Sequence, residues 1–361
     1  MRRLRALIAE ELAQPVAPEV RALADAIAQE HGPSVAAILF YGSCLREPER
    51  EGMLDFYVLV DDYRAFHGSL IQALANRLLP PTILYRVRSG TRAKVAVISR
   101  AAFMLRLRSE SRDTTVWARF CQPAALVHAR DRQAAAWAAD AVARAVATAA
   151  GFAARLGPEE GTSRDFWCAL FRNTYEAELR IERGGDRGAL IYEHAAERFD
   201  RLFGPALAEA GIGVGAREGA CVPTLSRDPG RDDRPPEPLA DPVHARVGGD
   251  DAGGGRDFPP VKGEGSPADG RHPAEARIRP QVADRAAARR VWRRRCRLGK
   301  ALNLARLVKA AFTFAPHADY LAWKVERHSG RSLELGPFQR RHPVLAAPWV
   351  LWRLYRHRGR R

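Results

Sequence analysis

The first half of the chain alternates between stretches with helical spacing of apolar residues and short continuous apolar runs. Within residues 18–31, Val20, Leu23 and Ile27 fall on one face of a helix, and the charged residues fall elsewhere. The same spacing predicts helices over residues 2–14, 18–31, 63–79, 100–108, 134–156 and 165–183. We expect the third of these to end at Pro80 and Pro81, because proline cannot continue a helix.

The short apolar runs have the length and the flanks of strands. Residues 35–41 and 54–60 are rich in aliphatic and aromatic side chains, and residues 83–88 and 94–99 flank a Ser-Gly turn. The order along the chain is helix, two strands, helix, two strands and then several helices. This order predicts an α+β fold with a small mixed sheet.

The junction between the first two strands carries the candidate chemistry. The first apolar run ends in Tyr41-Gly42-Ser43, and Asp55 follows near the start of the second run. Gly42 has no Cβ, so the backbone can approach a triphosphate closely. The Ser43 hydroxyl and the backbone N–H groups after it can hold phosphate oxygens, and Asp55 can hold Mg²⁺. This layout is typical of a nucleotidyltransferase-like site; the alternative is a tight turn between two core strands.

The usual second carboxylate of such a site is missing. Most nucleotidyltransferases of this type carry Asp-x-Asp, whereas Tyr57 stands two residues after Asp55 here. Asp61 is on the same face of the strand, but six residues of strand span about 20 Å. We expect Asp61 and Asp62 to cap the helix that begins at Tyr63. The second carboxylate therefore comes from elsewhere, or the site is inactive.

Composition indicates the kind of partner. The net charge is +16 and the isoelectric point is near 10.4, which favours polyanionic partners. The five cysteines are far apart and form no Cys-x-x-Cys, which fits a reducing compartment without a zinc site. No apolar run is long enough to predict a transmembrane helix. The abundance of Ala, Arg and Gly suggests a GC-rich bacterial genome.

The order of the predicted elements and a change in composition near residue 213 predict four regions. Residues 1–130 form the catalytic domain, and residues 131–212 form a helical domain. Residues 213–284 are rich in Gly, Pro, Asp and Arg, which predicts a disordered insert. Residues 285–361 form a basic helical region in which arginines alternate with Trp, Leu and Tyr near the end. This last pattern favours association with an anionic membrane; a basic tail on a core helix and an RNA-binding tail are the alternatives.

Several motifs in order resemble one known family, the mitochondrial phosphatidate cytidylyltransferases, or translocator-maintenance proteins. The similar segments are Tyr41-Gly42-Ser43, Met53-Leu54-Asp55-Phe56, Val60-Asp61-Asp62, Phe66-His67, the Lys94 strand, Trp117 to Pro123, and Thr174 to Arg180. The resemblance covers about residues 35–205. The chain departs from the family pattern at Cys44, at Val95-Ala96 and at Ala177-Glu178.

The resemblance implies an activity, its substrates and its site. The family joins CTP to phosphatidic acid with Mg²⁺, which yields CDP-diacylglycerol and pyrophosphate for phospholipid biosynthesis. It implies that Asp55 and Glu178 hold the metal and that Lys94 and Arg119 neutralise charge. Tyr41, Gly42, Ser43 and Arg180 would bind the nucleotide. The protein would work in the cytoplasm as a peripheral protein on the inner face of the membrane, with no specific nucleic acid as partner.

Each of these residues also has a plain structural interpretation. Glu178 and Arg180 belong to a helix in which Glu176 and Arg180 can form an ion pair. Lys94 can point to solvent from its strand, and His67 is more often a helix-face residue than a ligand. Two other functions therefore stay open: a nucleotidyltransferase with another acceptor, and an inactive protein that binds anionic lipid or nucleic acid.

Overall fold

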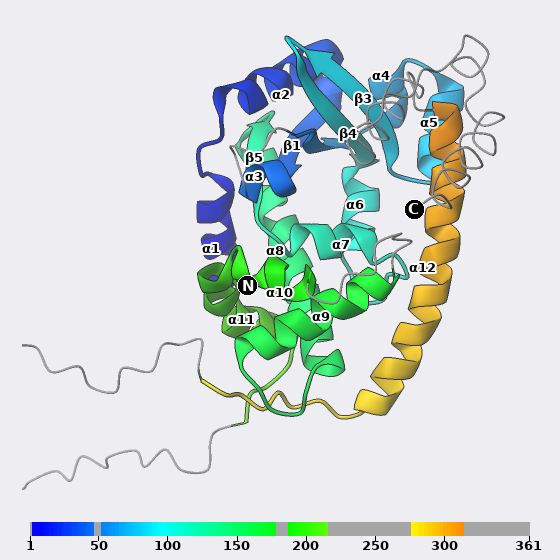
Figure 1. Ribbon diagram of the computed structural model, residues 1–361. Helices are drawn as coiled ribbons and strands as arrows, with labels where there is room; N and C mark the ends of the chain where they lie inside the picture. Colours follow the sequence, from blue (N-terminus) through cyan, green and yellow to red (C-terminus); the bar gives the residue numbers. More distant parts are fainter. Residues whose placement is uncertain (1, 47–51, 178–186, 216–275, 314–361) are drawn as a thin grey trace, which may run out of the picture. The chain divides into compact units, whose positions relative to one another are not determined.

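A computed structural model describes residues 2–46, 52–177, 187–215 and 276–313 (Figure 1). The predicted site residues Glu178 and Arg180 lie outside the described residues. So do most of the predicted insert and the predicted membrane-facing C-terminus beyond residue 313. Within the described ranges, no helix is long and apolar enough to cross a membrane.

A five-stranded mixed sheet forms the centre of the fold (Figure 1). Its strands are β1 (Val35–Tyr41), β2 (Leu54–Val60), β3 (Thr82–Arg88), β4 (Thr91–Ser99) and β5 (Ala124–Ala129), in the order β3-β4-β2-β1-β5. β2 and β4 are parallel, and the other neighbours are antiparallel. The predicted α+β fold with a small mixed sheet is confirmed. Strand β5 was not predicted, because its alanines have low strand propensity.

The two faces of the sheet bury different sets of side chains. On one face, Ile38, Phe40 and Phe56 pack with α2 (Pro18–His31). Alternation along each strand then puts Leu39 and Tyr57 on the other face, which a second set of helices covers. The predicted site residue Asp55 shares this second face with Tyr57.

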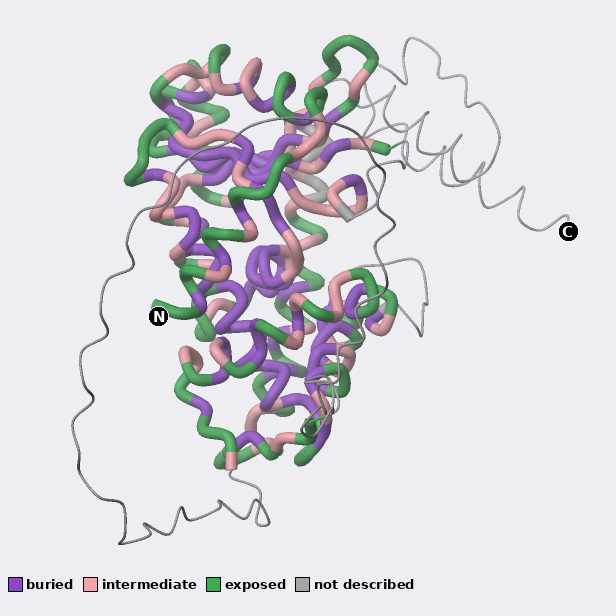
Figure 2. Tube along the Cα trace, turned by 90° about the vertical axis from the view of Figure 1, so that its left-hand side faces the viewer, coloured by how far each residue is buried: buried purple, intermediate pink, exposed green. Residues whose placement is uncertain are grey.

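The helices on the second face continue one hydrophobic core with the sheet. They are α1 (Arg2–Leu12), α6 (Arg100–Arg106), α7 (Thr115–Phe120), α8 (Arg132–Leu156), α9 (Ser163–Ala177), α10 (Arg187–Glu193) and α11 (Ala196–Glu209). Figure 2 shows buried residues running from the sheet into these helices. Asp131 accepts a hydrogen bond from the Ala134 N–H at 2.7 Å and begins α8. The boundary expected at residue 130 stays a prediction, but side chains on both sides of it share this core.

Helix α12 (Arg285–Thr313) begins at the predicted residue and packs against both the helices and the sheet. Trp292 is buried between Trp117 and Phe152. Arg295 stacks on the Phe152 ring and donates to the Ser109 carbonyl at 2.6 Å. The helix contains ten Lys and Arg and no acidic residue. Helix α12 therefore packs against the core although it is strongly basic.

The helix predicted over residues 63–79 is wrong in one respect, because two helices occupy this range. α4 (Tyr63–His67) ends at Gly68, which has a left-handed backbone with φ of 63°. α5 (Leu70–Leu78) then begins after Ser69, whose hydroxyl caps it by accepting from the Gln72 N–H. Gly68 is the C-cap of α4 and Ser69 is the N-cap of α5. These two caps end one helix and begin the next, although the helical spacing of apolar residues continues across them.

The two acidic residues before α4 have different roles. Asp62 caps α4, as predicted, by accepting hydrogen bonds from the Arg64 and Ala65 N–H groups at 3.1 Å. Asp61 does not cap the helix. It instead accepts from Arg100 at 2.6 Å and from Arg130 at 2.8 Å.

Candidate nucleotide-binding site

Tyr41, Asp55 and Lys94 lie in one row across the sheet. Asp55 of β2 is the register partner of both Tyr41 of β1 and Lys94 of β4. The row continues to Ala124 on β5 and Tyr85 on β3, so it crosses all five strands. Neighbouring strands are about 4.8 Å apart, which brings the first three side chains into a common neighbourhood on one face. Three of the predicted site residues therefore come together.

Gly42 closes the end of β1 directly beside Asp55. Its φ of 97° is in the region that favours glycine, and a Cβ there would lie 3.0 Å from Oδ2 of Asp55. The short helix α3 (Ser43–Arg46) begins at the next residue, so Ser43 also lies at this junction. Cys44 is buried, and its thiol donates to the Met53 carbonyl at 3.5 Å, which links the ends of β1 and β2. The Asp55 side chain thus packs directly against the Gly42 backbone, where any other residue would crowd the carboxylate.

Arg119 reaches the same row from α7. Its Nη1 donates to the Thr115 carbonyl at 2.6 Å, and its guanidinium is a hydrogen-bond donor to the Tyr41 hydroxyl. Burial of this hydroxyl and the Asp55 charge raise the pKa of Tyr41 well above its usual value, and Arg119 acts in the opposite direction. The neutral Tyr41 hydroxyl therefore lies close to both the Asp55 carboxylate and the Arg119 guanidinium. Such a pair of charges on a partly buried surface suits a ligand with phosphate groups and a metal ion.

A second set of charged residues, missed by the sequence analysis, lies behind Arg119. Asp113 is buried and accepts from the Thr115 N–H at 3.0 Å and from its hydroxyl at 2.6 Å. Arg306 of α12 contacts both Asp113 carboxylate oxygens and donates to the Thr115 hydroxyl at 3.2 Å. Because Thr115 carries the carbonyl that holds Arg119, α12 helps to fix the position of Arg119 from 187 residues away in the sequence (306 minus 119).

The charge state of this set follows from its contacts. Burial alone would raise the pKa of Asp113, but the hydrogen bonds from Arg306 and Thr115 outweigh it and hold this pKa at about 2. Arg106 adds a further cation, with its Nε 3.3 Å from Asp113. Burial lowers the pKa of Lys309 to about 8, helped by the Arg306 and Arg106 charges. This set thus contains three half-buried cations, Arg106, Arg306 and Lys309, and one buried carboxylate, Asp113.

Sequence signals for this set exist but are weak. Asp113 precedes two threonines and an apolar helix, which is a capping pattern. Arg306 lies eleven residues after Arg295, which puts both on one face of α12. Neither signal identifies the partner, because the contact joins residues 193 positions apart.

His67 lies in a structural position away from the row. Its Nε2 is 3.0 Å from Nδ2 of the buried Asn76, and its ring packs near Tyr63 and Phe66. Burial lowers the pKa of His67 to about 4, and His31 and Lys309 add to the effect. The ring is therefore neutral near pH 7 and serves the packing of α4 against α5.

The donor set fits a magnesium ion only together with a ligand. Among the described residues, no group of three or more His, Cys, Asp and Glu could hold a metal ion. Mg²⁺, however, keeps several waters and is often bound by one or two carboxylates plus substrate phosphates. The single Asp55 carboxylate, in close contact with the Gly42 backbone, fits that mode of binding. Glu178, the second predicted ligand, lies outside the described residues.

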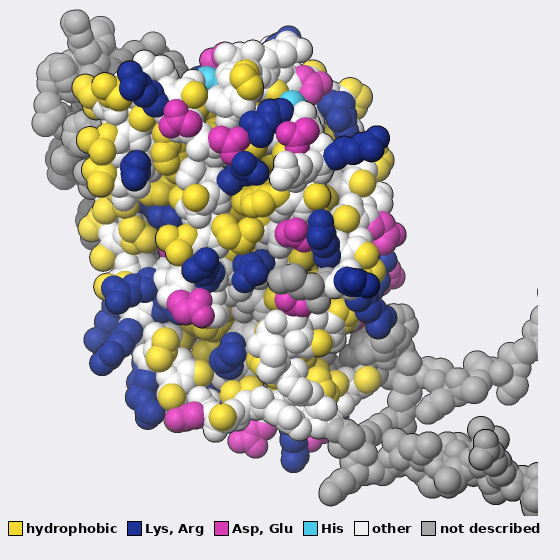
Figure 3. Space-filling view, turned by 180° about the vertical axis from the view of Figure 1, so that it is seen from behind, with side chains coloured by type: hydrophobic (Ala, Val, Ile, Leu, Met, Phe, Trp, Pro, Cys, Tyr) yellow, Lys and Arg dark blue, Asp and Glu magenta, His cyan; other side chains and the backbone are white. Residues whose placement is uncertain are grey.

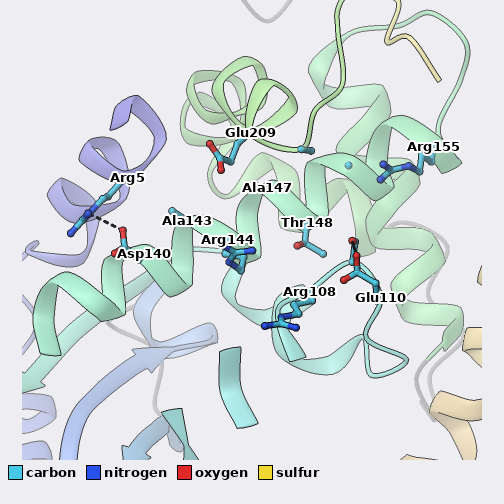
Figure 4. A pocket seen from close by; sticks show the side chains of 13 residues that line it. Arg5, Arg108, Glu110, Asp140, Ala143, Arg144, Ala147, Thr148, Arg155 and Glu209 are labelled. Atoms are coloured by element: carbon cyan, nitrogen blue, oxygen red, sulfur yellow. Dashed lines mark hydrogen bonds and ion pairs between the residues drawn. The ribbon is translucent and has the colours of Figure 1, made fainter. Parts of the chain in front are cut away.

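Two cavities elsewhere in the described part of the molecule are separate from the row. One, of about 470 Å³, lies between α1, α8, α11 and the turn after α6 (Figure 4). Four arginines and three carboxylates line it, and Arg5 is bound to Asp140 at 2.8 Å. The other, of about 650 Å³, lies between α9 and α12. No residue of the row lines either cavity, and their mixed charges indicate no particular ligand.

Comparison with known proteins adds no assignment. No protein-family model matches the chain, and no curated protein shows significant similarity to it. The function must therefore be argued from the residues and their arrangement.

Proposed function

We propose that this chain is a nucleotidyltransferase that makes CDP-diacylglycerol and pyrophosphate from CTP and phosphatidic acid. One observation carries the proposal: the Asp55 carboxylate lies between Tyr41 and Lys94 in the sheet, directly beside Gly42. Arg119, which hydrogen-bonds to Tyr41, adds a second cation to this neighbourhood. The choice of CTP and phosphatidic acid comes from the sequence resemblance.

The reaction needs charge neutralisation more than proton transfer. A phosphate oxygen of phosphatidic acid attacks the α-phosphorus of CTP, a new P–O bond forms, and the bond to the β-phosphate breaks. Pyrophosphate takes the electron pair of that bond. The attacking phosphate monoester is already an anion near neutral pH, so no strong general base is required. Catalysis then rests on positioning and on stabilising the charge that develops.

Each residue has a role that fits its position. Lys94 and Arg119 would neutralise charge on the phosphates, and the Gly42-Ser43 backbone would let the triphosphate approach closely. Asp55 would hold Mg²⁺, with Glu178 as the candidate second ligand; the ion would supply additional positive charge at the phosphates. Arg306 and Asp113 have no direct part in binding the metal or the phosphates. They would act by positioning Arg119.

A direct assay tests the proposal. Labelled CTP is mixed with phosphatidic acid vesicles and Mg²⁺, and the chloroform-soluble product is counted. We expect Asp55→Asn to lower the rate by about a thousandfold, because an amide oxygen is a poor ligand for Mg²⁺. Asp140→Asn is the matched control, since this carboxylate lies on α8 in the separate cavity; its rate should be unchanged. Equal rates for wild type and Asp55→Asn would contradict the site.

A protein with an inactive site is the second candidate, and one observation favours it. The residue two positions after Asp55 is Tyr57, whose ring is buried against Phe103 and Phe120. The strand therefore offers no room for the usual second carboxylate. This candidate predicts no product with any acceptor and no Mg²⁺-dependent affinity for nucleotides. A product with CTP and a different acceptor would instead indicate another transferase.

A further inference from the structure

Helix α5 is amphipathic, but its apolar face points to solvent instead of to the core. Its large aliphatic side chains are the exposed ones: Leu70 is 63% exposed, Ile71 82%, Leu74 57% and Leu78 74%. These positions span about 100° of the helix circumference, so they form one face. On the inward side, Asn76 is polar and fully buried, and only the small Ala73 packs against the core. A surface helix of a globular protein normally has the opposite arrangement.

Specific contacts hold α5 in this orientation. The Ser69 hydroxyl caps its first turn, and Nδ2 of Asn76 is 3.0 Å from Nε2 of His67. At its other end, Lys309 of α12 donates to the Leu79 carbonyl at 2.6 Å and to the Pro81 carbonyl at 3.1 Å. Rolling the apolar face inward would break these hydrogen bonds at both ends of the helix.

Two segments that meet beside this face carry no acidic residue. Residues 63–109 contain nine Lys and Arg and no acidic residue, and residues 285–313 contain ten and none. The Lys309 contacts bring these two segments together in the structure. Arg64 and Arg77, on α4 and α5, are both exposed. In Figure 3, Lys and Arg side chains gather along the left-hand edge, where α12 lies in that view.

A second copy of the chain is a poor occupant for this face. Nine helical residues span about 13 Å, whereas a stable interface buries about 800 Å² on each partner. Two copies with a net charge of +16 would also repel each other. An anionic bilayer has neither problem, because its interface accepts aliphatic side chains and its head groups attract Lys and Arg.

We infer that the apolar face of α5, with the acid-free segments beside it, docks on an anionic phospholipid bilayer. Leu70, Ile71, Leu74 and Leu78 enter the interface between head groups and acyl chains, and the neighbouring arginines contact lipid phosphates. This docking does not depend on the proposed transfer reaction: it would occur with any anionic lipid and without a nucleotide.

Co-sedimentation of the full chain with vesicles tests the inference. Vesicles of phosphatidylglycerol and phosphatidylcholine are compared with pure phosphatidylcholine vesicles. We expect wild type to bind only the anionic vesicles, and Ile71→Ser with Leu74→Ser to weaken this binding about a hundredfold. Leu190→Ser is the matched control, because Leu190 is also an exposed leucine on a helix outside the acid-free segments; it should bind like wild type.

The other outcomes are decisive as well. Equal binding by the double variant and wild type would overturn the inference, as would absence of wild-type binding. If the double variant binds normally but changes the oligomeric state in light scattering without vesicles, the face is instead an interface between copies. Transfer to short-chain, soluble phosphatidic acid is assayed separately. If wild type binds the anionic vesicles and the double variant does not, but wild type shows no transfer, the docking stands and only the proposed function is refuted.

Discussion

Strand β2 carries one carboxylate at its start and another just beyond its end, and the two have opposite surroundings. Asp61 is bound by Arg100 and Arg130 at the surface; burial alone would raise its pKa, but the hydrogen bonds and charges of these two arginines together outweigh burial and lower it. Asp55 is partly buried beside Gly42, with Tyr41 and Lys94 as strand neighbours. Both residues are aspartates on the same strand face, so their type does not separate them. Their neighbours assign a structural role to Asp61 and make Asp55 the candidate for ligand binding.

The largest expected effect on stability concerns Asp113, a buried carboxylate that extends the comparison between Asp55 and Asp61. Asp113→Asn leaves Arg106 and Arg306 without their buried counter-charge, so we expect unfolding free energy to fall by about 3–5 kcal/mol. Urea unfolding at pH 7 measures this value. A loss below about 1 kcal/mol would show that the buried pair contributes no more than a surface pair.

The same carboxylate predicts a dependence of stability on pH. The pKa of Asp113 is about 2 in the folded chain and 3.8 ordinarily. A lowered folded-state pKa gives stability that is present above the ordinary pKa and is lost as pH falls toward the folded value. Wild type should therefore lose more stability than Asp113→Asn between pH 4 and pH 2, as measured by urea unfolding. Parallel curves for the two proteins would contradict this account.

A smaller effect is expected at Gly42, the glycine that contacts Asp55 but not Asp61. Gly42→Ala puts a Cβ 3.0 Å from Oδ2 of Asp55, so we expect transfer activity to fall about a hundredfold. Gly68→Ala is the matched control: its φ is also positive, at 63°, but no atom lies within 4 Å of the new Cβ. Both variants should lose about 1 kcal/mol of stability. Only Gly42→Ala should lose activity, and equal losses of activity in the two variants would refute the role of the close contact between Gly42 and Asp55.

The smallest effect is expected at Asp61. Its ion pairs are exposed, so Asp61→Asn should cost no more than about 1 kcal/mol in unfolding free energy. The transfer rate of this variant should stay within about twofold of wild type, because the Asp61 carboxylate is bound to Arg100 and Arg130 and has no role in the reaction. A large loss of activity would break the comparison between the two ends of the strand.

The parts of the fold that could be predicted from the sequence are those with strong local signals. The apolar runs defined β1 and β2 to the residue, and the Gly42-Ser43 junction was identified from its residue types alone. The break at Gly68 was missed, because the helical spacing continues across it. The contact of Arg306 with Asp113 could not be predicted, since nothing local relates two residues on elements so far apart in the chain. The outward face of α5 was missed for a related reason: periodicity shows that a helix is amphipathic, not which side faces the core.

The most direct test of the central claim is calorimetric titration of CTP into the protein with and without Mg²⁺. Wild type, Asp55→Asn and Asp61→Asn are compared under the same conditions, without any acceptor lipid. The account predicts that Mg²⁺ strengthens CTP binding to wild type and to Asp61→Asn, and that Asp55→Asn loses this dependence. Identical Mg²⁺-dependent binding by all three proteins, or no CTP binding by wild type, would contradict it.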